Sequence, residues 1–445
     1  MDVTLRFQTF LLAALLLSLT LLASCTLVPV AQRRANPGGP EYTVCDDGLK
    51  VFPEYRAYQG QNGWFFFEHD LEPEHPLMGQ TDFMTELSRR LRAQGVELVV
   101  VPVPARGVAA PANLYPGDPR QAAFSPDEGA AAYSAFVERL EFGGVRVFDV
   151  LSASRALAAA GRPAFFKRDL HWTTEGAKAL MAELARDLRR ELPDLSVTEV
   201  SAVREAAPYE HRGEFVSRWT YTHCGVALPT EPQPVYTVTE KSSGGLFGNA
   251  QPEVVLTGSS FSLPPYDYGF LAAGLQSGVL NVSVGAGGAV VGLQTYLVDG
   301  AYEAARPRVL VWEFPTYAPP LTAAQRRELL ASASGRCDAP AATVALGKGA
   351  RTSARLAGNA LPGYLQLEFS DRSVLAFDLE LTYSGGRETV QVRRSNLVPN
   401  RGLFLLTLDP ALGRLTRVGL ELSAAEGTVA VGVCEDRYAP PTAAH

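Results

Sequence analysis

Two short segments far apart in the chain carry the residue types needed for acyl transfer through a serine ester. One is Asp169-Leu170-His171-Trp172 and the other is Gly258-Ser259-Ser260-Phe261. A serine hydroxyl becomes an effective nucleophile when a hydrogen-bonded base takes its proton, and imidazole suits that task near neutral pH. A carboxylate then orients the imidazole. We therefore assign Ser260 as nucleophile, His171 as base and Asp169 as the orienting carboxylate.

The serine segment directly follows the apolar run 254–256, which is typical of a buried strand. Gly258 permits a tight turn, and in open α/β sheets ligands bind beyond the carboxyl ends of the strands. Backbone N–H groups at such a turn can face a developing oxyanion. Gly-Ser-Ser is also common in ordinary turns, so this segment alone favours a turn over a nucleophile.

Asp169 and His171 lie just before a helix expected over about 175–192, with Thr173 or Thr174 as its N-cap. A capped helix start makes the preceding loop a rigid support for an imidazole. Because the two residues are close in one loop, the carboxylate can reach one ring nitrogen while the other nitrogen points outward. The alternative is a surface loop in which an acid and a histidine occur by chance.

Composition indicates a folded protein without a basic surface for nucleic acid. The 445 residues are enough for two domains, and 47% apolar with 20% charged residues is ordinary for globular proteins. The formal net charge of −7 argues against nucleic acid as a partner.

The N-terminus predicts export. Arg6 precedes an apolar stretch that is too short to span a bilayer, so residues 1–24 are typical of a signal peptide. Leu22-Ala23-Ser24-Cys25 resembles the lipobox of bacterial lipoproteins, which predicts a lipidated Cys25. The alternative is an ordinary cleaved signal, or an uncleaved anchor, with an incidental cysteine. We expect a periplasmic or cell-envelope protein, lipid-anchored at Cys25, with residues 25–44 as a tether rich in Pro, Gly and Arg.

Four further cysteines, an even number in an exported chain, predict two disulfides. They allow three pairings. We prefer Cys45–Cys224 with Cys337–Cys434, because each pair then closes within one expected domain. No CxxC or Cys/His cluster has metal-ligand spacing, so we expect neither a metal nor a cofactor.

Residues 45–330 alternate apolar strand candidates with helical stretches. This alternation of strands and helices predicts a parallel sheet covered by helices on both faces. Residues 195–250, rich in Pro, Gly and Ser, interrupt it and are expected to be an irregular insertion. Residues 337–445 instead contain short β-favouring runs separated by turns, which predicts an all-β sandwich or jelly roll. The strand candidates there are 365–369, 375–383, 389–393, 403–408 and 428–433.

Five segments, taken in order, resemble the SGNH hydrolase-like domain of the AlgX/AlgJ alginate O-acetylation family. They are Gly63-Trp64, Val101-Pro102-Val103-Pro104, Asp169-Leu170-His171-Trp172-Thr173, Gly258-Ser259-Ser260-Phe261-Ser262 and Val311-Trp312-Glu313-Phe314-Pro315. The resemblance covers about residues 45–320, and the appended β domain with its cysteine pair is similar to that of AlgX. In this family the Asp-x-His motif precedes the serine, the reverse of ordinary SGNH esterases, and this chain has that order.

The resemblance implies an α/β SGNH-hydrolase-like domain followed by a β-sandwich similar to a carbohydrate-binding module. It implies an O-acetyltransferase that acts on an exopolysaccharide, alginate or a similar polymer, with Ser260, His171 and Asp169 as the catalytic residues. The expected acetyl donor is a membrane-bound O-acyltransferase or a partner protein, among other envelope proteins of polymer secretion. The family also implies an oxyanion-hole glycine among residues 285, 287 and 288.

Two other functions fit the same residues. A polysaccharide acetyl esterase would use the same chemistry with water as acceptor. A non-catalytic polysaccharide-binding scaffold would not need the Asp/His/Ser set. The β domain contains no tryptophan. Its candidate uronate contacts are Arg393, Arg394 and Arg401, although exposed strand arginines are more often simply solvated.

Overall fold

The structure is a computed structural model. It describes residues 29–32, 39–50, 55–213, 215–241, 252–298, 300–304, 306–338, 342–347, 351–356, 363–422 and 427–438. The expected signal peptide and Cys25 lie outside the described residues. Among the described residues, no helix combines the length and apolar character needed to cross a membrane.

A five-stranded parallel sheet lies at the centre of the first unit, in the order β10-β9-β11-β3-β4. Its strands are β3 (Glu97–Val103), β4 (Arg146–Val147), β9 (Val254–Thr257), β10 (Val279–Asn281) and β11 (Val309–Pro315). Every residue of β11, and all but the first of β3, is buried. A strand whose sheet is covered by helices on both faces has buried residues in succession, as β3 and β11 do. The predicted parallel sheet is therefore confirmed.

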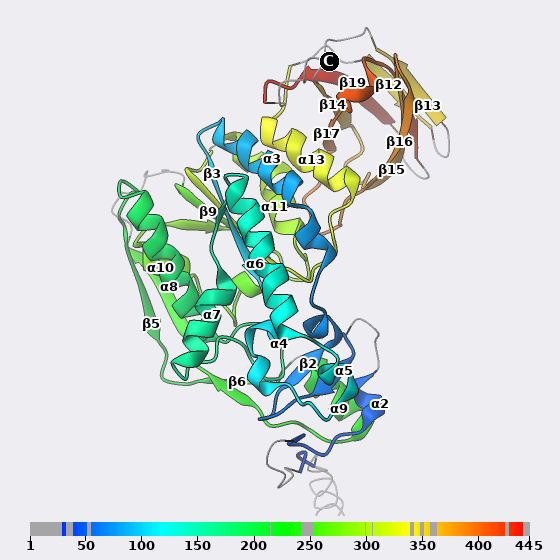
Figure 1. Cartoon of the computed structure of the whole chain (residues 1–445). Coiled ribbons are helices and arrows are strands. Elements are labelled where there is room, and N and C mark those ends of the chain that lie inside the picture. Colours follow the sequence, from blue (N-terminus) through cyan, green and yellow to red (C-terminus); the bar gives the residue numbers. More distant parts are fainter. Residues whose placement is uncertain are drawn as a thin grey trace, which may run out of the picture.

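Helices flank this sheet in two packed groups (Figure 1). One comprises α3 (Thr81–Arg92), α6 (Pro126–Phe142), α11 (Val291–Val298) and α13 (Ala323–Ser334). The other comprises α7 (Val150–Ala159), α8 (Thr174–Glu191) and α10 (Phe270–Leu275). Shorter helices are α2 (Asp46–Leu49), α4 (Arg106–Ala109), α5 (Pro119–Ala122), α12 (Ala301–Ala304), η2 (Glu68–Leu71), η3 (Pro76–Gly79) and η4 (Pro111–Asn113), with a hairpin of β1 (Ala57–Gln59) and β2 (Phe65–Phe67).

The expectation of an irregular insertion over residues 195–250 was wrong. Strand β5 (Glu199–Arg204) pairs with β8 (Tyr236–Lys241), and β6 (Tyr209–His211) pairs with β7 (Glu231–Gln233), both antiparallel. In the sequence, helix α9 (Phe215–Cys224) lies between β6 and β7. Most side chains of β5 and β6 face solvent, so the ribbons lack the apolar alternation that makes a strand visible in a sequence.

Both predicted disulfides are confirmed. The Cα atoms of Cys45 and Cys224 are 5.5 Å apart, and those of Cys337 and Cys434 are 6.0 Å apart, within the usual range for a bridge. The first bridge joins Cys224, the last residue of α9 in the insertion, to Cys45, the residue just before α2. Two disulfides are typical of an exported protein.

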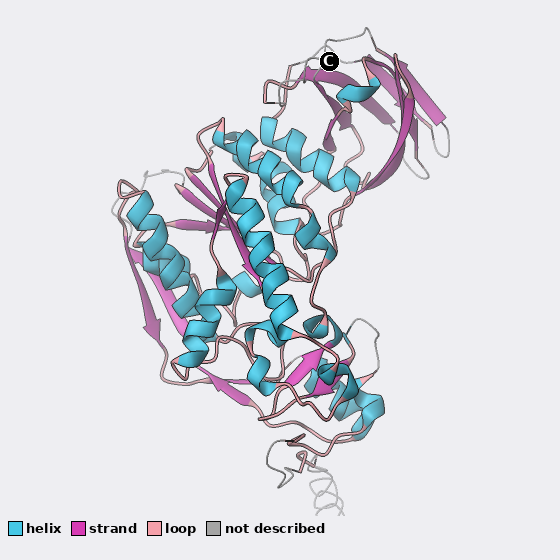
Figure 2. Ribbon diagram, in the orientation of Figure 1, coloured by secondary structure: helices cyan, strands magenta, loops and turns pink. Residues whose placement is uncertain are grey.

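The C-terminal unit is a sandwich of two antiparallel four-stranded sheets, as predicted (Figure 2). One sheet has the order β12-β19-β14-β17 and the other β13-β18-β15-β16. Their strands are β12 (Ala342–Leu346), β13 (Arg351–Arg355), β14 (Gly363–Phe369), β15 (Ala376–Tyr383), β16 (Arg387–Arg393), β17 (Leu403–Thr407), β18 (Leu415–Glu421) and β19 (Gly427–Glu435), with a short η6 (Pro410–Leu412). The apolar faces meet in a core that includes Phe369, Phe377 and Phe404.

Buried ion pairs join the two units. Arg394, which follows β16, pairs with Glu328 of α13, and its guanidinium lies 3.7 Å from the centre of the Phe404 ring. Arg90 of α3 is 2.7 Å from Asp436 at the end of β19. Removing one member of such a pair leaves the other charge buried and unpaired, which is strongly destabilising. These contacts therefore hold the sandwich in a defined position against α3 and α13.

Candidate active site

Ser260 lies just beyond the carboxyl end of β9, as the first residue of the short helix η5 (Ser260–Ser262). The preceding Gly258 is packed so closely that a Cβ atom would lie 2.5 Å from Glu313 Oε2 and 2.9 Å from Ser262 Oγ. A side chain at this position would displace the turn. The glycine predicted to permit a tight turn is therefore needed for close packing.

Glu313, near the end of β11, is hydrogen-bonded to the turn of residues 258–262. This turn, the nucleophile turn, carries the predicted nucleophile Ser260. The Glu313 carboxyl oxygens accept hydrogen bonds from the backbone N–H and the hydroxyl of Ser259, each at 2.9 Å, and from the Ser262 hydroxyl at 2.9 Å. The residues on both sides of Ser260 are thus bonded to one buried group. Burial, opposed by these hydrogen bonds, raises the pKa of Glu313 to about 7.

The histidine is presented by a tight hairpin that closes onto the start of α8. Phe166 N–H donates to His171 O at 3.1 Å, and Thr173 N–H donates to Ala164 O at 2.8 Å. Thr173 is the N-cap of α8, as predicted, and its hydroxyl accepts from Gly176 N–H. A Cβ atom at Gly176 would lie 2.2 Å from Ala164 O, so this glycine allows the hairpin to pack on the helix.

The structure brings the three predicted residues into one hydrogen-bonded chain. His171 Nδ1 is 2.6 Å from Asp169 Oδ1, and His171 Nε2 is 2.7 Å from Ser260 Oγ. The backbone N–H of His171 also donates to Asp169 Oδ1 at 3.0 Å. Tyr266 stacks on the imidazole with ring centres 3.6 Å apart, which limits how the base can rotate. This is the arrangement that general-base activation of a serine requires.

Asp169 is buried, which disfavours its charged form, yet its neighbours reverse that effect. Electrostatic attraction to His171 and hydrogen bonds from two histidines hold the pKa of Asp169 well below its usual range. The second histidine is His211, whose Nε2 is 2.9 Å from Asp169 Oδ2. Sequence reasoning missed this residue, which lies 42 positions away in the insertion and carries no motif.

The glycines expected at the oxyanion hole follow β10 and lie near the nucleophile turn. Val284 N–H donates to Gly258 O at 3.0 Å, which places the 284–288 loop beside that turn. Gly287 N–H bonds to Val284 O, and a Cβ atom there would be 2.8 Å from the same oxygen. Gly287 therefore shapes the loop, and an oxyanion contact from Gly285 or Gly288 stays a prediction.

A parallel sheet with a Ser–His–Asp chain at its carboxyl edge is the arrangement of several classes of serine-dependent acyl-transfer enzymes and hydrolases. Residues 57–316 match the family model described as the SGNH hydrolase-like domain of the acetyltransferase AlgX. This match spans more than half of the chain, and the chain belongs to that family.

Individual relatives agree with this assignment. The chain is 26% identical over 423 residues to the alginate biosynthesis protein AlgX of Pseudomonas syringae pv. tomato, covering 87% of this chain and 85% of the relative. It is 26% identical to the probable alginate O-acetylase AlgJ of Pseudomonas fluorescens, over 60% of this chain and 69% of the relative. The solved structure of Pseudomonas aeruginosa AlgX matches with a TM-score of 0.72 at 22% identity, covering 88% of this chain and 99% of that structure, and it shows the same fold.

Replacing Glu313 with Gln should change how stability depends on pH. The folded-state pKa of about 7 lies above the ordinary value of 4.5, so folding strengthens proton binding at this site. The resulting stabilisation is full below about pH 4.5 and is lost as the pH rises through about 7. It amounts to roughly 2–4 kcal/mol.

Urea unfolding at several pH values across this interval measures the effect. The parent should lose stability relative to the Glu313→Gln variant as the pH rises. Glu368→Gln, which alters an exposed carboxylate paired with Arg336, is the control and should follow the parent. If the parent and Glu313→Gln unfold with the same pH dependence, Glu313 does not titrate in this window.

Proposed function

We propose that this enzyme O-acetylates the hydroxyl groups of an exopolysaccharide, alginate or a similar polyuronate, through an acetyl-Ser260 intermediate. The observation that carries the proposal is the unbroken hydrogen-bonded chain from Asp169 through His171 to Ser260. The relatives named for alginate biosynthesis and alginate O-acetylation support the choice of polymer.

The first half-reaction loads the enzyme. Ser260 Oγ attacks the acetyl carbonyl of the donor while its proton passes to His171 Nε2, and Asp169 stabilises the imidazolium that forms. The tetrahedral intermediate collapses, the bond to the donor's leaving group breaks, and His171 returns the proton to that group. Acetyl-Ser260 and the deacetylated donor remain.

The second half-reaction unloads the enzyme by the same steps in reverse order. A sugar hydroxyl attacks acetyl-Ser260 and gives its proton to His171 Nε2. Collapse forms the acetylated sugar, and the proton returns to Ser260 Oγ. Water in place of the sugar would make the enzyme an esterase, so transfer depends on how well the acceptor competes with water.

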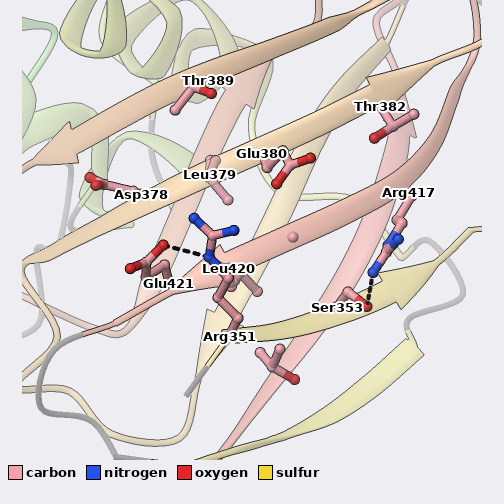
Figure 3. Close-up of a pocket in the computed structure, with 12 residues that line it drawn as sticks. Arg351, Ser353, Asp378, Leu379, Glu380, Thr382, Thr389, Arg417, Leu420 and Glu421 are labelled. Atoms are coloured by element: carbon pink, nitrogen blue, oxygen red, sulfur yellow. Dashed lines mark hydrogen bonds and ion pairs between the residues drawn. The ribbon is translucent and has the colours of Figure 1, made fainter. Parts of the chain in front are cut away.

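We propose that the outer face of the β13-β18-β15-β16 sheet holds the polymer. A shallow pocket of about 260 Å³ lies on this face (Figure 3). By strand register, Gly419 lies directly across from Ser353 and Glu380 on the neighbouring strands. Because Gly419 has no side chain, it opens a depression of a size suited to part of a sugar ring.

The lining of this depression mixes arginines with the carboxylates Asp378, Glu380 and Glu421, and we propose Arg417 as its contact to a uronate. Arg355 and Arg417 are directly opposite each other on β13 and β18, and Arg387 continues the same row through Thr382. Like charges placed opposite each other in a sheet are unfavourable unless an anion lies between them. Arg417 donates to the Ser353 hydroxyl at 3.0 Å, whereas Arg351 is neutralised by Glu421 at 2.7 Å (Figure 3).

The arginines expected from the sequence have other contacts. Arg394 is buried against Glu328 and cannot reach a polymer without breaking the contact between the two units. Arg393 is bonded to Asp378 at 2.7 Å, and Arg401 lies against Gly300. Burial of Arg394 against Glu328 argues against its role as a polymer contact, whereas Arg393 and Arg401 stay candidates.

We also propose that Cys25 carries a lipid and that a membrane-bound acyltransferase or another envelope protein supplies the acetyl group. The lipobox-like sequence before Cys25 supports the anchor. A lipid at this position, followed by the 25–44 tether, would keep the active site near a membrane-bound donor.

Substitutions of the three residues should show that they act as a unit. Ser260→Ala or His171→Ala should each reduce activity by at least about 10³-fold, and the double variant should lose little more. Asp169→Asn should be milder, because the base survives but loses its orienting charge. The assays are acetyl release from a chromogenic ester and acetyl transfer to an oligouronate, with Ser201→Ala on the exposed ribbon as control. Parental rates for Ser260→Ala in both assays would exclude an acyl-enzyme.

Arg417→Ala should weaken binding of an oligouronate by about tenfold, as expected for the loss of one charge-assisted hydrogen bond. Binding is measured by calorimetry at low and high salt. The control is Arg336→Ala, which removes an exposed arginine that is paired with Glu368 on the other sheet. Unchanged affinity of Arg417→Ala would place the polymer elsewhere.

Cys25→Ser should release the protein from membranes, because one side-chain substitution removes the attachment point of the lipid. Cell fractionation followed by detection of the protein measures this, and mass spectrometry of the parent's N-terminal peptide checks for the lipid. If the variant remains with the membrane fraction as the parent does, the attachment has another origin.

A further inference from the structure

His211 is a second imidazole at the catalytic carboxylate, and it comes from the inserted ribbon. It is the last residue of β6, where it pairs across the ribbon with Glu231 of β7. Its Nε2 lies 2.9 Å from Asp169 Oδ2, whereas Oδ1 of the same carboxylate faces His171. Asp169 thus lies between two imidazoles, one on each oxygen.

The surroundings of His211 hold its ring in one orientation. It is 2% exposed and stacks on Phe166, with ring centres 4.0 Å apart. It also meets the edge of Tyr266, the ring that stacks on His171. Both imidazoles are therefore packed by the same tyrosine.

The hydrogen bonds assign the tautomer of His211. Within the described residues, its Nδ1 is buried and has no hydrogen-bond partner. An ionised carboxylate only accepts, so Nε2 must carry the hydrogen that is donated to Asp169. A second hydrogen on Nδ1 would be a buried donor without an acceptor, so the neutral Nε2–H form fits this site.

We propose that His211 is a positioning residue for acyl transfer. Its hydrogen bond fixes the rotation of the Asp169 carboxylate, so that Oδ1 stays aligned with His171 Nδ1. It also favours the ionised carboxylate, which must stabilise the imidazolium of His171 when Ser260 is acylated. This proposal rests on the acyl-Ser260 mechanism, and it adds a fourth member to the chain, supplied by the insertion.

Two variants separate hydrogen bonding from packing. In His211→Gln the side-chain amide can donate from nearly the position of the imidazole Nε2, although the ring is lost. In His211→Phe the ring still stacks on Phe166 and Tyr266, but it cannot donate. The proposal predicts that Gln retains activity within about threefold, whereas Phe loses roughly tenfold or more, in kcat rather than KM.

The readouts are kcat and KM for a chromogenic acetyl ester and the rate at which a sulfonyl fluoride modifies Ser260, followed by mass spectrometry. Melting temperatures show whether both variants fold. Slow modification in the Phe variant, with near-parental modification in the Gln variant, supports positioning by the hydrogen bond. An active Phe variant, or equal losses in both variants, overturns it.

The two proposals can fail separately. If Ser260→Ala is inactive while His211→Phe has parental rates, the acyl-enzyme mechanism stands and the role of His211 falls. If Ser260→Ala is active, the mechanism itself fails, whatever the His211 variants show.

Discussion

A carboxylate buried away from solvent sets the arrangement of the whole active site. Asp169 is fully buried, and a buried charge is tolerated only when donors surround it. The hairpin supplies the backbone N–H and imidazole of His171, and the insertion supplies His211. Satisfying this one charge therefore requires two segments that are distant in sequence to meet, and the base is oriented as a consequence.

The distance between base and nucleophile is set by contacts beyond the catalytic residues themselves. Trp172 Nε1–H donates to Phe261 O at 2.8 Å, which bonds the histidine hairpin directly to the nucleophile turn. On the other side, the buried Arg106 donates to Phe166 O at 3.0 Å and pairs with Asp70 at 2.6 Å. The hairpin is thus hydrogen-bonded to both the turn after β9 and the segment after β3.

The sequence predicted the parts of this protein that depend on local patterns. Apolar runs marked β3, β9 and β11, the threonine before α8 marked its N-cap, and the family motifs identified Ser260, His171 and Asp169 as candidates. It did not predict His211, because that contact depends on how a solvent-exposed ribbon folds back over the hairpin. It also did not predict which arginines are neutralised, because their partners, such as Glu328 of α13 and Asp378 of β15, are distant in sequence.

Strand β13 of the C-terminal sandwich was missed for a similar reason. β13 reads Arg-Thr-Ser-Ala-Arg, and only its alanine is buried, since this edge strand has one face in solvent. A strand with so few apolar residues lacks the alternation that marks a strand in a sequence, so the pattern does not reveal it. The same exposed face, with Gly419 at its depression, is where we place the polymer.

The carboxyl group bonded to the base and the one bonded to the turn around Ser260 have pKa values shifted in opposite directions. Asp169 receives hydrogen bonds from two imidazoles and stays ionised, whereas Glu313 is held by hydroxyls and one backbone N–H, and burial raises its pKa to about 7. A negative charge so close to the nucleophile would oppose the oxyanion formed in each half-reaction. Below about pH 7 the protonated form of Glu313 predominates and holds the turn without that charge. One carboxylate thus supports the base, and the other shapes the turn around Ser260 with a negative charge that diminishes as the pH falls below about 7.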